Sequence, residues 1–215
     1  MQKIVPAILT VDPADLRQKL ELFSGPTNWL HIDIMDGTLV PGRTVNLFEL
    51  GEASKFFNLE IHLMVADPFK YFEDCSGIGA KRVIFHGEAV HEQEPMLSKL
   101  DAYEFSKGIA LNKATSVELV APYAKKISSI LLMGIEPGAQ GRPFDPAVLA
   151  KVKKVKETYP DLVLGVDGGV GSKNVQSVFA SGADYAVVGS DIMRAADPLS
   201  AFKSLEEMVQ STKAV

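Results

Sequence analysis

The sequence has few of the features that would suit an exported, membrane-bound or nucleic-acid-binding protein. It holds a single cysteine, Cys75, which excludes a disulfide within the chain and suits a reducing compartment. The first residues do not form a secretory signal, and no apolar run approaches the length of about 20 residues that spans a membrane. Lysine and arginine total 22 against 27 aspartates and glutamates, so the formal net charge of -5 offers no basic surface to nucleic acid or anionic lipid. We therefore expect a cytoplasmic protein with no nucleic-acid or membrane partner.

Signs of a second domain are also missing. The 215 residues contain no linker, low-complexity tract or shift in composition, and 47% hydrophobic with 23% charged residues is ordinary for a globular protein. No G-x-G-x-x-G motif follows the first apolar run, which argues against a dinucleotide site. We predict one domain that spans residues 1–215.

The chain does have a regular alternation of apolar runs, typical of strands, with segments of helical spacing. The predicted strands are Ile4–Leu9, Trp29–Asp33, Leu59–Met64, Arg82–His86, Lys107–Leu111, Ile127–Met133, Leu162–Asp167 and Tyr185–Val188. Because these runs are apolar throughout, they indicate strands buried on both faces, as in a parallel sheet covered by helices. Eight strand-helix repeats in this length predict a closed (β/α)₈ barrel, whereas the alternative, a doubly wound open sheet, normally uses fewer strands.

Apolar residues at helical spacing recur between the predicted strands and after the last one. One of these segments contains Val117 and Val120, and the final one runs from Leu199 to Met208. Residues that cap helix N-termini predict where four of the helices begin. These starts are Asp12-Pro13, Asp145-Pro146, Ser172 and Asp197-Pro198.

Four polar residues lie at or near the C-terminal ends of the predicted strands: His31, Asp33, His62 and Asp167. In a barrel those ends meet at one rim, where active sites lie, and His31 and Asp33 share a face of their strand. Any one of the four alone is more simply read as a hydrogen-bonded core residue or a helix cap. Together they favour a divalent metal site whose carboxylates also move protons, because buried carboxylates without partners are costly. His86 is a further candidate for this pocket, whereas we expect His91 at the surface.

Glycine-rich segments follow the last three predicted strands: Gly138-Ala139-Gln140-Gly141, Gly168-Gly169 and Gly189-Ser190. One such pair is weak support for a site, since glycine also serves turns. Three on neighbouring loops, with a short helix starting at Ser190, indicate a cradle of backbone N–H groups for an anion. Barrels often bind phosphate after strands seven and eight, so we predict a phosphorylated ligand.

Three methionines lie at or just beyond strand ends on the same rim: Met35, Met64 and Met133. Methionine commonly fills irregular gaps in a core. Here it would equally suit an apolar lining over a substrate, and the sequence pattern does not decide between the two interpretations.

In these segments the chain resembles the ribulose-phosphate 3-epimerase family over nearly its whole length. The matching segments are Pro6-Ala7-Ile8-Leu9, His31-Ile32-Asp33-Ile34-Met35-Asp36-Gly37, His62-Leu63-Met64-Val65, Phe85-His86, Pro137-Gly138, Val166-Asp167-Gly168-Gly169 and Val188-Gly189-Ser190. The resemblance implies a (β/α)₈ barrel that holds a divalent cation through His31, Asp33, His62 and Asp167. It also implies that Asp33 and Asp167 are the acid/base pair. The implied substrate contacts are the methionine cap of Met35, Met64 and Met133, the loop glycines Gly138 and Gly141, and phosphate contacts from Gly168, Gly169, Gly189 and Ser190.

The chain departs from the family pattern in the substrate-contacting shell. The first serine of the usual P-S-I-L-S segment is Ala7, and Thr10 stands where the second is expected. The usual N-P-G-F-G-G loop reads Glu136-Pro137-Gly138-Ala139-Gln140-Gly141. Because the metal and proton-transfer residues are intact, these changes leave the substrate rather than the reaction type open.

The resemblance implies epimerisation at C3 of a phosphorylated ketose, D-ribulose 5-phosphate to D-xylulose 5-phosphate. Two imidazoles favour zinc, or iron, manganese or cobalt, over magnesium and calcium. One alternative is a 3-epimerase for a hexulose phosphate such as allulose 6-phosphate. Another is a non-catalytic barrel that binds a phosphorylated ligand. We also expect the chain to form a homo-oligomer.

Overall fold

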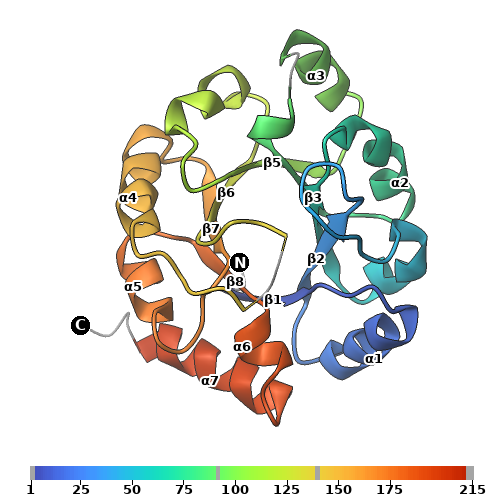
Figure 1. The fold of residues 1–215 in the computed structure, drawn as a ribbon, viewed down its shortest axis with the longest axis vertical. Coiled ribbons are helices and arrows are strands. Elements are labelled where there is room, and N and C mark those ends of the chain that lie inside the picture. Colours follow the sequence, from blue (N-terminus) through green and yellow to red (C-terminus); the bar gives the residue numbers. More distant parts are fainter. Residues whose placement is uncertain (1–2, 91–92, 139–140, 212–215) are drawn as a thin grey trace.

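The protein is a barrel of eight parallel strands, as the sequence predicts. The computed structural model describes residues 3–90, 93–138 and 141–211. The strands follow one another around the barrel in sequence order, and the first pairs with the last to close it (Figure 1). Their bounds are β1 (Ile4–Ile8), β2 (Trp29–Met35), β3 (Asn58–Met64), β4 (Arg82–His86), β5 (Ser106–Leu111), β6 (Ser129–Met133), β7 (Val163–Asp167) and β8 (Tyr185–Val188).

Helices surround the strands in Figure 1. The α-helices are α1 (Pro13–Phe23), α2 (Phe72–Gly77), α3 (Gln93–Leu100), α4 (Val148–Thr158), α5 (Val175–Ala180), α6 (Ser190–Met193) and α7 (Pro198–Ser211). The 3₁₀ segments are η1 (Leu47–Leu50), η2 (Ala53–Lys55), η3 (Pro68–Tyr71), η4 (Gly87–Ala89) and η5 (Val117–Tyr123). The predicted helix at Val117 is thus a 3₁₀ turn, and Pro122, which lacks a backbone N–H, lies within it.

Two of the four predicted helix starts are confirmed. Asp12 accepts a hydrogen bond from the backbone N–H of Ala14 at 2.8 Å, and Asp197 accepts one from that of Ser200 at 3.1 Å. The start at Asp145 is early by two residues, because the aspartate binds the N–H of Ala147 at 3.0 Å and α4 begins at Val148.

The start predicted at Ser172 is wrong. The backbone N–H of Ser172 donates to the Asp191 carboxylate at 2.9 Å, and the Asn174 side chain accepts from the N–H of Gly171 at 2.9 Å. These contacts hold residues 171–174 in a turn, so α5 begins only at Val175.

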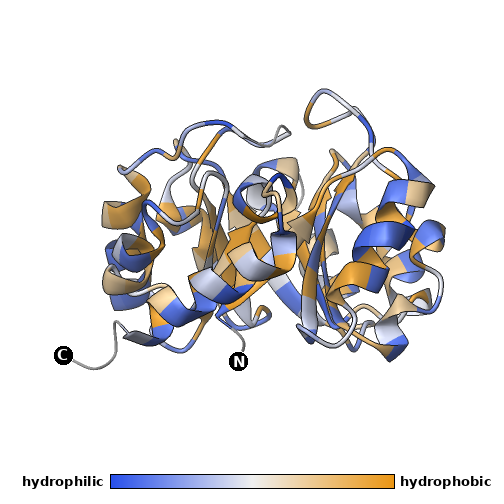
Figure 2. Ribbon diagram, turned by 90° about the horizontal axis from the view of Figure 1, so that it is seen from below, coloured by the Kyte–Doolittle hydropathy of each residue, from blue (hydrophilic) through white to orange (hydrophobic). Residues whose placement is uncertain are grey.

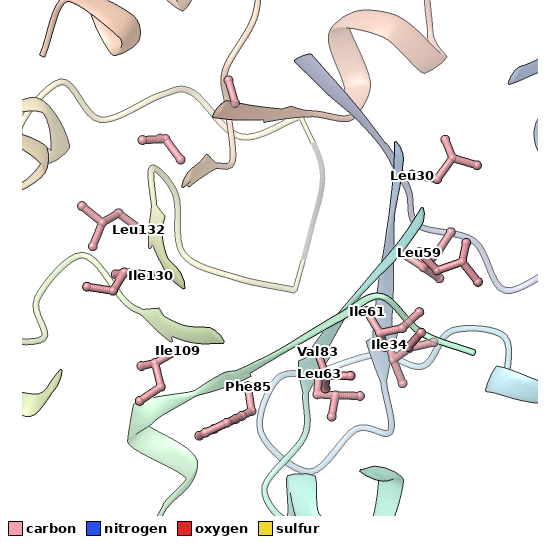
Figure 3. Packing of buried hydrophobic residues seen from close by; sticks show 14 of the residues in the cluster. Leu30, Ile34, Leu59, Ile61, Leu63, Val83, Phe85, Ile109, Ile130 and Leu132 are labelled. Atoms are coloured by element: carbon pink, nitrogen blue, oxygen red, sulfur yellow. The ribbon is translucent and has the colours of Figure 1, made fainter. Parts of the chain in front are cut away.

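Apolar side chains fill two separate regions of the fold. The larger one lies between the strands and the helices, and Figure 3 shows strand residues such as Leu30, Ile61 and Phe85 that belong to it. Figure 2 shows mainly hydrophobic strands in the middle of the molecule and, around them, helices that carry both hydrophobic and hydrophilic residues. The second region lies among alternate residues of the same strands and includes Leu131 and Val187. Burial on both faces explains why the strand sequences are apolar throughout.

The pairing register places the polar strand residues at matching levels. Between β2 and β3, His31 lies opposite Glu60 and Asp33 lies opposite His62. Between β6 and β7, Met133 lies opposite Asp167. Because alternate residues share a face, these side chains project to the same side of the barrel wall.

Cys75 is buried in α2, and burial raises the pKa of its thiol to about 12, which leaves it protonated and unreactive. In residues 3–90, 93–138 and 141–211 we find no helix with the length and apolar character needed to cross a bilayer.

The close packing inside the barrel predicts that no side chain larger than that of Gly165 fits at this position. It lies opposite Tyr185, whose side chain is fully buried, and a Cβ at Gly165 would come within 2.3 Å of the tyrosine ring. We expect Gly165→Ala to lower the free energy of unfolding by about 1–3 kcal/mol, measured by urea denaturation, because overpacking a core forces shifts. The control is Gly77→Ala in α2, where a Cβ meets nothing within 4 Å. Equal midpoints for the two variants would contradict this account of the packing.

Candidate active site

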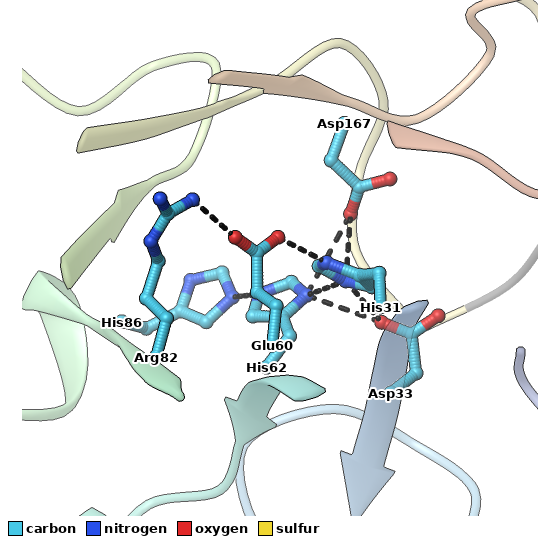
Figure 4. A network of polar contacts seen from close by, with 7 residues as sticks. All are labelled: His31, Asp33, Glu60, His62, Arg82, His86 and Asp167. Atoms are coloured by element: carbon cyan, nitrogen blue, oxygen red, sulfur yellow. Dashed lines mark hydrogen bonds and ion pairs between the residues drawn. The ribbon is translucent and has the colours of Figure 1, made fainter. Parts of the chain in front are cut away.

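Four predicted residues come together at the C-terminal ends of β2, β3 and β7. Asp33 Oδ1 lies 3.2 Å from His31 Nε2 and 3.1 Å from His62 Nδ1. Asp167 Oδ2 lies 4.0 Å from His31 Nε2 and 3.6 Å from His62 Nδ1. Figure 4 shows the two carboxylates reaching the pair of imidazoles from different parts of the barrel wall. The sequence-based prediction that these side chains meet at one rim agrees with this geometry.

The geometry of this group, the His-Asp cluster, fits a divalent metal ion. One nitrogen or oxygen atom from each of His31, Asp33, His62 and Asp167 lies within 4.8 Å of the others. The two imidazole nitrogens are 3.3 Å apart, close to the roughly 3.3 Å that separates ligands bound tetrahedrally at about 2.0–2.1 Å. Two nitrogens and two carboxylate oxygens form a donor set that suits first-row ions.

The two aspartates differ in their affinity for a proton. Burial disfavours ionisation of Asp33, but hydrogen bonds to His31 and His62 outweigh this and hold the pKa of its carboxyl well below the usual range. Burial raises the pKa of Asp167 to about 7, because the attraction of His31 does not offset the burial and the negative charges of Asp33 and Glu60. Without a metal, Asp33 is therefore ionised near neutral pH, whereas Asp167 is protonated in part.

The two histidines also differ, because their outer nitrogens have different partners. Burial would lower the pKa of His31, but hydrogen bonds to Asp33 and Glu60 raise it well above its usual value. Burial lowers the pKa of His62, whose Nε2 lies 3.0 Å from Nε2 of His86. Nδ1 of His86 in turn lies 3.3 Å from the Glu88 carboxylate. His86 therefore contacts the site through His62.

Sequence reasoning missed a buried ion pair behind His31. Glu60 Oε1 lies 2.6 Å from His31 Nδ1, and Glu60 Oε2 accepts a hydrogen bond from Arg82 at 2.6 Å (Figure 4). The signal was present, because Glu60 precedes His62 by two residues and therefore shares its face of β3, as His31 and Asp33 do on β2. Arg82 begins β4 opposite Glu60.

A pocket lined by loop glycines adjoins the His-Asp cluster. Its walls include Asp33, Asp167 and the loop residues Gly138, Gly141, Gly168, Gly169, Gly189 and Ser190. Gly169 has a φ of 69°, and a Cβ there would lie 2.7 Å from the backbone of Phe144, so only glycine fits. Successive glycines in this conformation present backbone N–H groups that suit an anion such as phosphate.

Some of the other residues predicted to contact the substrate line this pocket, and others do not. Ala7, Met64 and Met133 line the pocket, whereas Met35 is buried against Met64 and Val40 beside it. The side chain of Glu136 is exposed, and its carboxylate lies 3.7 Å from Lys113. His91, Ala139 and Gln140 are outside the described residues.

Comparison with known proteins identifies relatives of the whole chain. The family model described as the ribulose-phosphate 3 epimerase family matches residues 3–193. The ribulose-phosphate 3-epimerase of Schizosaccharomyces pombe is 31% identical, over 98% of this chain and 95% of the relative. The cytoplasmic isoform of that enzyme from Oryza sativa is 32% identical, over 98% of this chain and 96% of the relative. Among solved structures, KGPDC from Streptococcus mutans shares the fold with a TM-score of 0.75 at 14% identity, and each chain is covered completely.

The pKa directions predict that metal binding at this site displaces protons. At pH 6 the metal-free site holds a proton on Asp167, whose pKa is about 7, and one on His31, whose pKa is raised. Since metal ligands must be deprotonated, we expect about one to two protons to be released per Zn²⁺ bound. The apparent affinity should therefore rise between pH 5 and 8. Calorimetry in buffers with different ionisation enthalpies counts the protons, and Asp167→Asn should release fewer. Binding at pH 6 without proton release would show that these groups are not ligands.

Proposed function

The chain belongs to the ribulose-phosphate 3-epimerase family, and we propose that it converts D-ribulose 5-phosphate to D-xylulose 5-phosphate by epimerisation at C3. The observation that carries the proposal is the meeting of Asp33, from β2, and Asp167, from β7, beside a glycine-lined pocket. Inverting a carbon next to a carbonyl requires a base on one face and an acid on the other. A pair of carboxylates from β2 and β7 supplies both.

We propose that Asp33 removes the C3 proton in one direction and that Asp167 donates the replacement proton. The second oxygen of each carboxylate points away from the histidines in Figure 4, so it is free to exchange a proton with the substrate. In the reverse direction the roles exchange, because the product has lost one proton to Asp33 and gained one from Asp167. Each positioned proton transfer typically contributes about 10²–10⁴ in rate.

We propose that His31, Asp33, His62 and Asp167 hold the divalent cation, with zinc as the ion and iron, manganese or cobalt as substitutes. When bound, the ion would supply Lewis-acid stabilisation of the negative charge that develops on the substrate oxygens as the C3 proton leaves. The protein side chains keep this charge in a buried site, where His31 and His62 are fully buried and Asp33 is 6% exposed.

The glycine pocket would bind the phosphate and orient the sugar. We propose that the backbone N–H groups of Gly168, Gly169, Gly189 and Ser190 hold the phosphate, since these residues line the pocket beside Asp167. Met64 and Met133 would then cover the reacting carbons and exclude water. Binding a remote phosphate lowers the barrier by fixing C3 between the two carboxylates.

Ala7 supports a second candidate substrate. It lines the pocket at a position where the resemblance implies a serine that contacts substrate, and alanine lacks that hydroxyl. A hexulose phosphate such as allulose 6-phosphate is therefore the alternative.

We further propose a cytoplasmic location and a homo-oligomer. The name of the Oryza relative places that protein in the cytoplasm. Phe48 and Phe56 are 70% and 67% exposed, which suits a surface covered by another copy of the chain.

The two-base proposal predicts that Asp33→Asn and Asp167→Asn each abolish net epimerisation. The remaining carboxylate still faces its own side of the substrate, so one variant should retain exchange of the C3 proton with solvent in one epimer. Proton NMR of each epimer in heavy water measures both processes. Epimerisation at the wild-type rate in both variants would show that the aspartates are not the acid and base.

The phosphate proposal predicts that free ribulose is turned over at least about a hundredfold less efficiently than ribulose 5-phosphate. A coupled assay should compare these with allulose 6-phosphate, using wild type and Ala7→Ser. Preference for the hexulose phosphate by tenfold in kcat/KM, about 1.4 kcal/mol, would move the assignment to that substrate. Failure of wild type to turn over either phosphate would favour a binding protein.

A further inference from the structure

The buried pair Glu60 and Arg82 connects directly to the proposed metal site. Glu60 is fully buried, and its two oxygens have different partners, His31 Nδ1 at 2.6 Å and Arg82 at 2.6 Å. The Arg82 guanidinium lies over the rings of Trp29 at 4.8 Å and Tyr185 at 5.1 Å. The arginine thus packs against two aromatic rings while it holds the carboxylate.

Stability alone does not account for a charged pair at this position. Removing both charges from water is expensive, and apolar residues of similar volume often give equal or greater stability. Other positions of the barrel interior are apolar, such as Val5, Ile84 and Val187. The contact that an apolar pair would lose is the one between Glu60 and His31.

That contact determines which nitrogen of His31 faces the other proposed ligands. A carboxylate can only accept a hydrogen bond, so Glu60 requires the proton of His31 to sit on Nδ1. In the metal-loaded site Nε2, which lies 3.2 Å from Asp33 and 3.3 Å from His62, would then direct its lone pair toward the His-Asp cluster. Outer carboxylates that fix a ligand in this way also increase its basicity.

His62 lacks this kind of direct support. Its outer nitrogen faces a second imidazole, that of His86, and the carboxylate of Glu88 is reached only through that ring. The two imidazoles are therefore not equivalent.

We propose that Glu60, anchored by Arg82, is a positioning residue that fixes the ring and tautomer of His31 and makes it the stronger of the two nitrogen donors. This role rests on the proposed metal site. It assigns to the pair a function in metal affinity rather than in folding.

The test uses the double variant Glu60→Gln/Arg82→Met. The glutamine amide can donate or accept, so it no longer selects a tautomer, and methionine leaves no buried unpaired charge. Zn²⁺ affinity is measured by competition with a chromophoric chelator, and the ligand field by the visible spectrum of bound Co²⁺. We expect affinity to fall roughly 10–100-fold and the Co²⁺ spectrum to change, because outer partners of ligands have effects of this size.

Ser129→Ala is the matched control. Ser129 is fully buried in β6, and its hydroxyl does not contact the His-Asp cluster. The Ser129→Ala variant should therefore bind Zn²⁺ with the wild-type affinity and give the wild-type Co²⁺ spectrum. A folded double variant with wild-type Zn²⁺ affinity and Co²⁺ spectrum would overturn the proposal. Absence of Zn²⁺ binding by wild type would instead overturn the metal site itself, and with it this role.

A second measurement needs no variant and decides the matter if the double variant does not fold. In Zn²⁺-loaded wild-type protein with ¹⁵N-labelled histidine, His31 should carry its proton on Nδ1 and none on Nε2. The opposite tautomer would overturn the role of Glu60.

Discussion

The structure depends on pairing of charged groups that a closed barrel would otherwise exclude from its interior. Three histidines, three carboxylates and a guanidinium lie inside or at the rim of a wall of apolar strands. Each has an opposite charge or a hydrogen-bond partner within about 4 Å, as groups removed from water require. The register between β2 and β3 creates this arrangement, because it places two pairs of polar residues side by side.

This arrangement links the fold to the chemistry. The same burial that raises the pKa of Asp167 strengthens the hydrogen bonds that lower the pKa of Asp33. Two identical side chains therefore differ in their affinity for a proton, although both lie within about 4 Å of the same histidines. The proposed epimerase needs two carboxylates at one site, and a parallel barrel supplies them because every strand delivers its last residues to one rim.

The barrel and the meeting of the four site residues could be predicted from the sequence, for physical reasons. Continuous apolar runs indicate strands buried on both faces, and the i, i+2 rule correctly places His31 beside Asp33. The start of α5 could not be predicted in this way, because Asp191, distant in sequence, holds Ser172 in a turn. Glu60 shares a face of its strand with His62 by the same i, i+2 rule, but its pairing with His31 and Arg82 depends on the register between strands, which was not predicted. The roles of the site residues, including the phosphate contacts, stay predictions.

A crystal structure of the protein grown with Zn²⁺ and ribulose 5-phosphate would test the central claim most directly. Anomalous scattering at the zinc edge locates the ion without reference to the fold. The account predicts one ion in contact with His31 Nε2, His62 Nδ1, Asp33 and Asp167, with the phosphate against Gly169 and Gly189 and C3 between the two carboxylates. An ion bound elsewhere, or a sugar whose C3 lies far from both aspartates, would contradict it.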